Sequence, residues 1–470
     1  MNIQSISFNT YYNIPQIQQI KHNAVSNPVH INSTLPCDCV SFSGVSHGGD
    51  ILKKLSAYGI PDMYTGQILL NPKIIEKWQN KGVFNYPIGR LTEIISNYEH
   101  SLMPIDKQFF HIIKGIAKTS PDLTLSEATK ELYPKHKKLL LRAQQPIFEG
   151  IIRLACDLPK DLYEEFSELM NITNKRLLND PVVLPFSEKE FLYKLKRIGD
   201  NITIKGNKGE IHAINKLISS ARAIFNSEQR GQKIFGKKIK QKLETQMLPE
   251  NLKRNSTNFA KFKEIFENSP LRKNEYIIRL LENTSAKIHG FPSYAQFERK
   301  SFIHELKKIT RKLKNRKFAQ EFTELSLKLP TSKDNVSAFI VKYAEENNNK
   351  IGTNMLIGAS CSVDHLLAKK NGGASKLANY GLTSAETNRQ KTNIYFDKWL
   401  KIHPETRQNC QKYVDRLIEL YKQGIFEKIS KEENKHKRLD KSYIEDFAAT
   451  IYDMSPENNR IILDISKLYE

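Results

Sequence analysis

The chain has 470 residues, of which 73 are lysine or arginine and 51 are aspartate or glutamate, so its formal net charge is +22 at pH 7. This length predicts two or three domains, and the positive charge favours a polyanionic partner, of which nucleic acid is the natural one. No segment approaches the roughly 18 apolar residues of a membrane span, and five scattered cysteines exclude a disulfide framework, so we expect a cytoplasmic protein with no membrane partner.

Residues 1–48 are rich in Asn, Ser, Gln and Pro and show little hydrophobic periodicity, which predicts a disordered segment. The segment has neither the basic start nor the apolar core of a secretory signal. Cys37 and Cys39 lie within it and could chelate a metal, but a Cys-x-Cys pair without further partners is a weak signal that we interpret as incidental.

Helical patterns dominate residues 49–330. Asn71 followed by Pro72 is typical of a helix N-terminus, and apolar side chains then recur at helical spacing, as in the stripe Leu91, Ile94, Ile95 and Tyr98. One stretch looks different: residues 201–211 alternate like a strand and contain Gly206 and Gly209, so we expect a small hairpin there.

Basic residues cluster at 233–242 and at 307–317. In the second cluster Phe302, Leu306, Ile309 and Leu313 recur at helical spacing, which sends the cations to the opposite face of the helix. This face is either ordinary solvated surface or a surface that follows a phosphate backbone. On the second interpretation, the phosphate-binding residues are Lys307, Lys308, Arg311 and Lys312.

The region from Met355 to Trp399 carries the most specific pattern. An apolar run over 355–367 suits a strand, Asn371-Gly372-Gly373 suits a turn, and residues 380–382 can return as a second strand. Thr383 to Glu386 has the form of a capping box that opens a helix, on which Lys391, Thr392, Tyr395 and Trp399 would share one face. The expected order is strand, loop, strand, helix.

Within this region Asp364 and His365 are followed by Asn379, Asn388 and Lys391 at fixed intervals. This order resembles the HNH motif of the His-Me finger, or ββα-metal, endonucleases, in particular the HNH domain of the CRISPR RNA-guided nucleases. The resemblance implies that His365 is the general base and that Asp364 and Asn388 bind one Mg²⁺ or Mn²⁺ ion. It implies a positioning role for Asn379, which would tie the loop to the backbone. Arg389 and Lys391 are candidate phosphate contacts.

The sequence departs from the family at three points, one of which is Ala368, three residues after the histidine, where the family often has proline. Many HNH proteins hold a structural zinc with two Cys-x-x-Cys pairs, whereas only Cys361 and Cys410 lie near this motif, so no zinc is expected. Gly381 lies inside the second predicted strand, where glycine costs stability.

These observations together predict a mainly α protein in which a large helical body is followed by a small ββα-metal unit near the C-terminus. We expect a disordered segment over 1–48, a helical and nucleic-acid-binding body over 49–330, an HNH domain over 331–424 and a helical tail over 425–470. The expected function is metal-dependent cleavage of nucleic acid, with DNA as the expected substrate. The alternative is a helical nucleic-acid-binding or scaffold protein whose HNH-like unit does not cleave.

Overall fold

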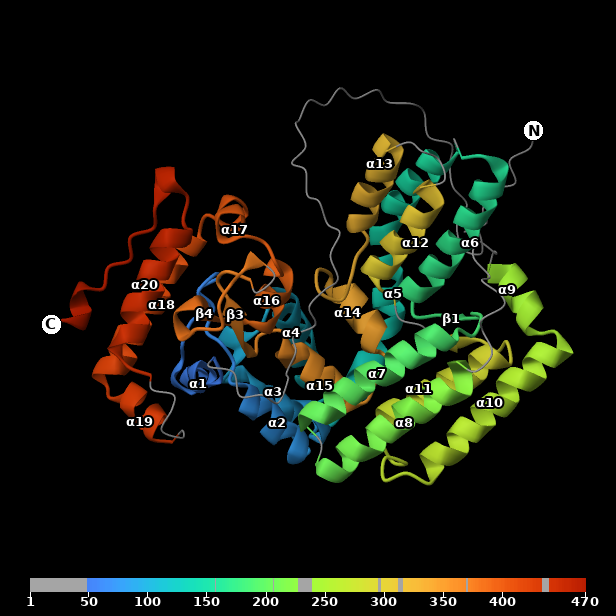
Figure 1. Cartoon of the computed structure of the whole chain (residues 1–470), viewed down its shortest axis with the longest axis horizontal. Helices are drawn as coiled ribbons and strands as arrows, with labels where there is room; N and C mark the ends of the chain where they lie inside the picture. Colours follow the sequence, from blue (N-terminus) through green and yellow to red (C-terminus); the bar gives the residue numbers. More distant parts are fainter. Residues whose placement is uncertain are drawn as a thin grey trace.

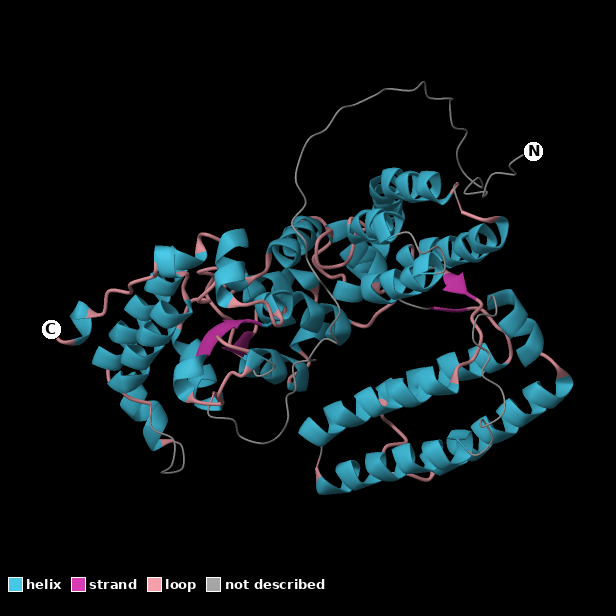
Figure 2. Ribbon diagram, turned by 45° about the horizontal axis from the view of Figure 1, so that its top comes forward, coloured by secondary structure: helices cyan, strands magenta, loops and turns pink. Residues whose placement is uncertain are grey.

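The computed structural model describes residues 49–470 except 157, 206, 227–238, 295–296, 312–315, 369–370 and 433–438. This part is mainly α-helical, as the sequence predicts, and its two sheets each contain two antiparallel strands (Figures 1 and 2). None of its helices combines the length and apolar character needed to cross a membrane. The predictions for residues 1–48, including Cys37 and Cys39, lie outside the described residues.

One apolar core joins the first helices to two helices that come more than 200 residues later. Asn71 caps helix α2 (Pro72–Asn80) by accepting a hydrogen bond from the Lys73 amide, as predicted. Leu91 and Ile95 of the predicted stripe are buried, and Phe109 packs on Phe339 with ring centroids 4.8 Å apart. The helices of this core are α2, α3 (Ile88–Ser96), α4 (Pro104–Ala117), the start of α5 (Leu125–Ala155), α14 (Val336–Tyr343) and α15 (Asn348–Ile357).

Two further cores form the remainder of the helical body. The first packs the end of α5 against α6 (Lys160–Leu177), α12 (Arg299–Arg311) and α13 (Arg316–Leu327). The second joins α7 (Glu188–Lys205), α8 (Lys208–Asn226), α10 (Pro249–Glu267) and α11 (Glu275–Ile288), with α9 (Ile239–Gln246) beside α10. The short strands β1 (Pro181–Val182) and β2 (Ser293–Tyr294) pair between these groups.

The hairpin expected over residues 201–211 is wrong. Helix α7 continues to Lys205 and α8 begins at Lys208, so the segment forms two helices. Leu195, Ile198 and Ile202 recur at three- and four-residue spacing and pack into the core, and this helical period outweighs the local alternation of β-branched residues.

The strand, loop, strand, helix order is found over a shorter stretch than predicted, as β3 (Cys361–His365), β4 (Tyr380–Ser384) and α16 (Ala385–Lys391), here called the hairpin–helix unit. The apolar run from Met355 is not a strand throughout, because α15 continues to Ile357. The capping box expected from Thr383 to Glu386 is wrong by one residue, because the helix cap is Ser384, which accepts a hydrogen bond from the Thr387 amide.

The expected long helical face after α16 is also wrong. Helix α16 ends at Lys391, and Thr392 has a φ of 50°, a conformation that ends the helix. Tyr395 and Trp399 therefore belong to a separate element, since Tyr395 precedes and Trp399 lies within α17 (Phe396–Ile402).

The hairpin–helix unit shares a core with both ends of the described chain. Apolar residues between Ile51 and Leu69, some of them in α1 (Asp50–Lys53), pack against it, and so do the C-terminal helices. Gly424, with a φ of 72°, separates α18 from α19. The divisions expected at 330 and 424 therefore do not follow the cores. The C-terminal helices are α18 (Thr406–Lys422), α19 (Ile425–Lys431) and α20 (Lys441–Met454).

Candidate active site

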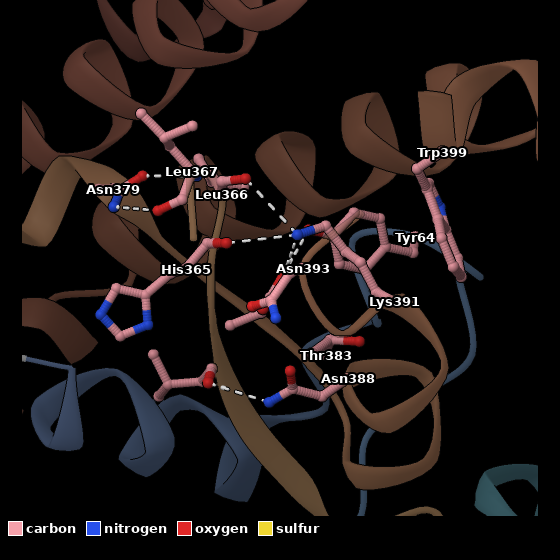
Figure 3. A network of polar contacts seen from close by, with 12 residues as sticks. Tyr64, His365, Leu366, Leu367, Asn379, Thr383, Asn388, Lys391, Asn393 and Trp399 are labelled. Carbon is pink, nitrogen blue, oxygen red and sulfur yellow. Dashed lines mark hydrogen bonds and ion pairs between the residues drawn. The ribbon is translucent and has the colours of Figure 1, made fainter. Parts of the chain in front are cut away.

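Asn379 closes the loop that joins β3 to β4. Its amide oxygen accepts from the Leu367 amide at 2.8 Å, and its amide nitrogen donates to the carbonyls of Leu367 at 3.0 Å and Ala374 at 2.9 Å (Figure 3). The residue is 8% exposed, so little water competes for these hydrogen bonds. Asn379 thus fixes the backbone immediately after His365, which is the geometry that a positioning residue requires.

Asn388 connects α16 to β3. Its amide nitrogen donates to Ser362 Oγ at 2.9 Å and to the Val363 carbonyl at 3.2 Å. Figure 3 shows this nitrogen directed at the strand, with the amide oxygen beside it. Because the nitrogen is used by the strand, the amide oxygen is the atom that remains for a ligand.

The carboxylate of Asp364 is buried and already has two partners. Its Oδ2 accepts a hydrogen bond from the Tyr64 hydroxyl at 2.6 Å and forms an ion pair with Lys391 Nζ at 2.9 Å. Burial and the charge of Asp364 raise the pKa of Tyr64 well above its usual value, so Tyr64 stays protonated and donates. The ion pair already offsets much of the negative charge that Asp364 would offer to a metal.

Lys391 does not fit the prediction that it contacts phosphate. Its side chain is 0% exposed, and besides Asp364 its Nζ lies 3.3 Å from the His365 carbonyl and 3.5 Å from the Leu366 carbonyl. The ammonium group also lies 5.5 Å from the centre of the Tyr64 ring. The sequence places a cation three residues after Asn388, but the end of α16 turns it into the core, where it neutralises Asp364.

The imidazole of His365 lies on the other side of β3. It meets the Tyr380 ring edge-on, with ring centroids 4.7 Å apart, and Figure 3 shows it pointing away from Lys391 and Tyr64. Successive side chains of a strand point to opposite faces, and β3 keeps this alternation up to its last residue. The structure therefore brings Asp364, Asn388 and Lys391 to one side of the strand and His365 to the other.

Two residues near this site carry no signal in the sequence. Tyr64 precedes its partner Asp364 by 300 residues. Asp62 is buried and accepts from the amides of Tyr64 and Ser384, both at 2.8 Å, and from the Thr383 hydroxyl at 3.0 Å. Asp62 thus joins the turn that carries Tyr64 to the end of β4, although no fixed spacing relates these positions.

The predicted phosphate contacts other than Lys391 lie in two separate places. Arg389 is exposed and pairs with Glu386 at 2.6 Å. Lys307 and Lys308 lie on α12, whose core is different from that of the hairpin–helix unit, and Lys308 pairs with Glu305 at 2.5 Å. The side chain of Arg311 is not described, and Lys312 lies outside the described residues. The cluster at 233–242 also falls largely outside them.

The residues present suit a hydrated oxygen-preferring ion better than zinc. In the described ranges, no three or more His, Cys, Asp or Glu side chains gather as a metal site. Asp364 and Asn388 offer one carboxylate and one amide oxygen, a small set of the kind that Mg²⁺ uses together with water and substrate phosphate. Burial raises the pKa of Cys361 to about 12, so Cys361 remains a thiol, and Cys410 donates from its thiol to the Met63 carbonyl at 3.4 Å.

No protein-family model, curated protein or solved structure matches this chain. The link to the HNH nucleases accordingly rests on the order of Asp364, His365, Asn379 and Asn388 and on the elements that carry these residues.

Asp106 is a buried carboxyl group behind α16, and it gives the fold a pH dependence. Burial raises its pKa from 3.8 to about 7; Lys333 and Arg389 oppose this shift and Glu386 adds to it. Between these two pKa values the folded state retains a proton that the unfolded state has lost, so stability falls as the pH rises from about 4 to about 7.

We therefore expect Asp106→Asn to stabilise the protein at pH 8, by on the order of 3 kcal/mol, and to have less effect at pH 5. Melting curves of variant and wild type at both pH values measure this difference. The exposed Asp122 provides the control, because Asp122→Asn removes a carboxylate that lies in solvent. An equal effect of Asp106→Asn at both pH values would contradict the expected titration.

Proposed function

We propose that this protein is a metal-dependent endonuclease of the HNH type that hydrolyses phosphodiester bonds in nucleic acid, with DNA as the expected substrate, in the cytoplasm. The observation that supports this most is the attachment of Asn388 to β3. Two hydrogen bonds from its amide nitrogen hold α16 to the strand that carries Asp364 and His365, and the amide oxygen remains for a ligand. A helix joined in this way to a hairpin is the layout that the residue pattern implies.

In this mechanism each residue of the chain has a separate task. The His365 imidazole accepts the proton of the attacking water, the general-base role that histidine fills most often in enzymes. Asp364 and Asn388 would hold the ion through their oxygen atoms. When bound, Mg²⁺ or Mn²⁺ supplies charge stabilisation to the phosphate and the leaving oxygen. Asn379 keeps the loop after His365 in place, and Arg389 contacts a neighbouring phosphate.

A second candidate function is supported by the partners of Asp364. Lys391 and Tyr64 both occupy Oδ2 of this carboxylate, and the His365 ring lies on the other face of the strand. A protein that binds nucleic acid without cleaving it would keep such an arrangement unchanged. The two functions differ in one measurable property, which is metal-dependent hydrolysis.

We expect the purified full chain to cleave supercoiled plasmid with Mg²⁺ or Mn²⁺ and to lose this activity in excess EDTA. Activity should return when Mg²⁺ is added back, without added zinc, because the proposed ligands are oxygen atoms. A labelled RNA of matched sequence, run in parallel, distinguishes the substrate class. Stoichiometric zinc required for folding would refute the assignment of oxygen ligands, and the absence of cleavage in both substrates would favour the second candidate.

A further inference from the structure

Helix α16 also contacts the helical body, because its Glu386 pairs with Lys333 of the segment that precedes α14. Arg389 and Lys333 both reach Glu386, at 2.6 and 3.7 Å. Lys342 of α14 lies 3.5 Å from the hydroxyl of Ser332, the residue before Lys333, and the charges of Lys333, Arg389 and Lys350 of α15 all act on it. We call these four cations, Lys333, Lys342, Lys350 and Arg389, the basic seam.

Lys342 is a cation without a matching anion. It is partly buried, its hydrogen-bond partner is Ser332 Oγ at 3.5 Å, and no described carboxylate lies within ion-pair distance of it. Burial, with the charges of Lys333 and Lys350, lowers its pKa to about 8, and the charge of Glu298 opposes this shift only in part. The protein therefore retains a partly desolvated ammonium group among other cations, an arrangement that costs free energy until an anion is present.

The carboxylates nearby do not balance the basic seam. Glu386 is shared between Arg389 and Lys333, so it offsets one of the four positive charges. Asp106 has a pKa of about 7 and is therefore only partly ionised at neutral pH. Lys350 lies over the Tyr276 ring, with Nζ 5.7 Å from the ring centre, and this contact leaves its charge in place.

We propose that the basic seam binds the phosphodiester backbone of the nucleic acid beyond the scissile phosphate, with Lys342 as its central contact. This proposal rests on the proposed function, which identifies the polyanion as nucleic acid. It further states where the strand runs after it leaves the candidate active site, which is along the basic seam. Arg389 adjoins Asn388 in the sequence, and consecutive residues of a helix point to different sides of it. A helix with its side chains is about 10–12 Å across, which is the length along the duplex axis that roughly three phosphates of one strand span. A nucleic-acid strand that passes α16 therefore reaches the basic seam.

The proposal moves the expected phosphate surface from α12 to the junction beside α16. In Figure 1, α14 and α15 stand between α16 and the long helix α5, whereas α12 belongs to the separate group around α6 and α13. Lys308 of α12 also has a carboxylate partner in Glu305, which reduces the gain from a bound phosphate. The unbalanced charge therefore lies at the junction.

Binding of the full chain to a labelled 30-base-pair DNA and to an RNA of the same sequence, in EDTA and over a series of salt concentrations, tests the proposal without requiring cleavage. Lys342→Gln should weaken binding roughly threefold to tenfold and lower the slope of log affinity against log salt by about one on the preferred nucleic acid. Its melting temperature should equal or exceed that of the wild type. Lys342→Arg keeps the charge and should keep the slope.

Lys431→Gln, on the exposed side of α19, is the matched control and should leave the slope unchanged. An unchanged slope in Lys342→Gln, or a loss of slope in Lys308→Gln instead, would overturn the proposal. If Lys342→Gln fails to fold, Lys350→Gln supplies the same test. If the wild type cleaves nucleic acid but Lys342→Gln leaves the salt slope of binding unchanged, only the proposal for the basic seam is refuted. If the wild type does not cleave but Lys342→Gln reduces the salt slope, the proposed nuclease activity is refuted and the basic seam remains as a binding surface.

Discussion

His365→Ala is expected to lower the rate of plasmid cleavage by about 10²- to 10⁴-fold while fold and DNA binding stay nearly unchanged. The substitution removes the group proposed to accept the proton of water. Its structural cost is small, because the imidazole is only partly buried and its aromatic contact is the edge-on approach to Tyr380. Single-turnover cleavage at saturating Mg²⁺, with melting curves alongside, measures both effects.

His403→Ala is the control for this experiment, because His403 lies outside the site but also packs on an aromatic ring. The centroids of the His403 and Trp399 rings are 4.1 Å apart. Asn388→Ala and Asp364→Ala should differ from His365→Ala by raising the Mg²⁺ concentration needed for half-maximal rate, since they remove ligands. A folded His365→Ala protein that cleaves like wild type would exclude the proposed mechanism.

Lys391→Met is expected to destabilise the protein by about 3–5 kcal/mol, because it leaves the buried Asp364 carboxylate without its cation. Adding Asp364→Asn to this variant should recover part of the loss, since the uncompensated charge is then gone. Chemical denaturation of the wild type, the two single variants and the double variant gives the coupling free energy directly.

The same series separates the observed role of Lys391 from the role expected from the sequence. A phosphate contact would lower the salt dependence of DNA binding and leave stability almost unchanged. Lys398→Met, on the exposed face of α17, controls for the loss of a lysine as such. A stable Lys391→Met protein with a reduced salt slope would reinstate the original prediction.

The sequence was most informative where chemistry and backbone conformation depend on neighbouring residues. Asn71 caps a helix through a bond to an amide two positions away, and the helix predicted to begin near Thr383 begins one residue later, after its cap Ser384. The order of Asp364, His365 and Asn388 also lies within 25 consecutive residues. Such local signals predicted the hairpin, the helix after it and the candidate side chains.

Partners far apart in the chain could not be predicted in this way. Nothing in the spacing relates Tyr64 to Asp364 or Asp62 to Ser384, and without these partners Lys391 looks like a surface cation. Gly381 illustrates the same limit. Alone it looks like a weak point of the strand, but a side chain there would collide with Met63, so the missing Cβ gives Met63 its place in the core.

The separation of Tyr64 from Asp364 has a consequence for synthesis on the ribosome. The turn held by Asp62 is translated some 300 residues before the strand to which it binds, and α20 of the same core emerges later still. At about 5–20 residues per second this interval lasts roughly 15–60 s. During this interval residues 51–69 of the nascent chain lack the residues with which they form this core, so the core around the hairpin–helix unit is completed only after most of the polypeptide has been made. A chain truncated by a premature stop codon before the hairpin lacks Asp364, His365 and Asn388, and under the proposed function it is expected to be inactive on nucleic acid.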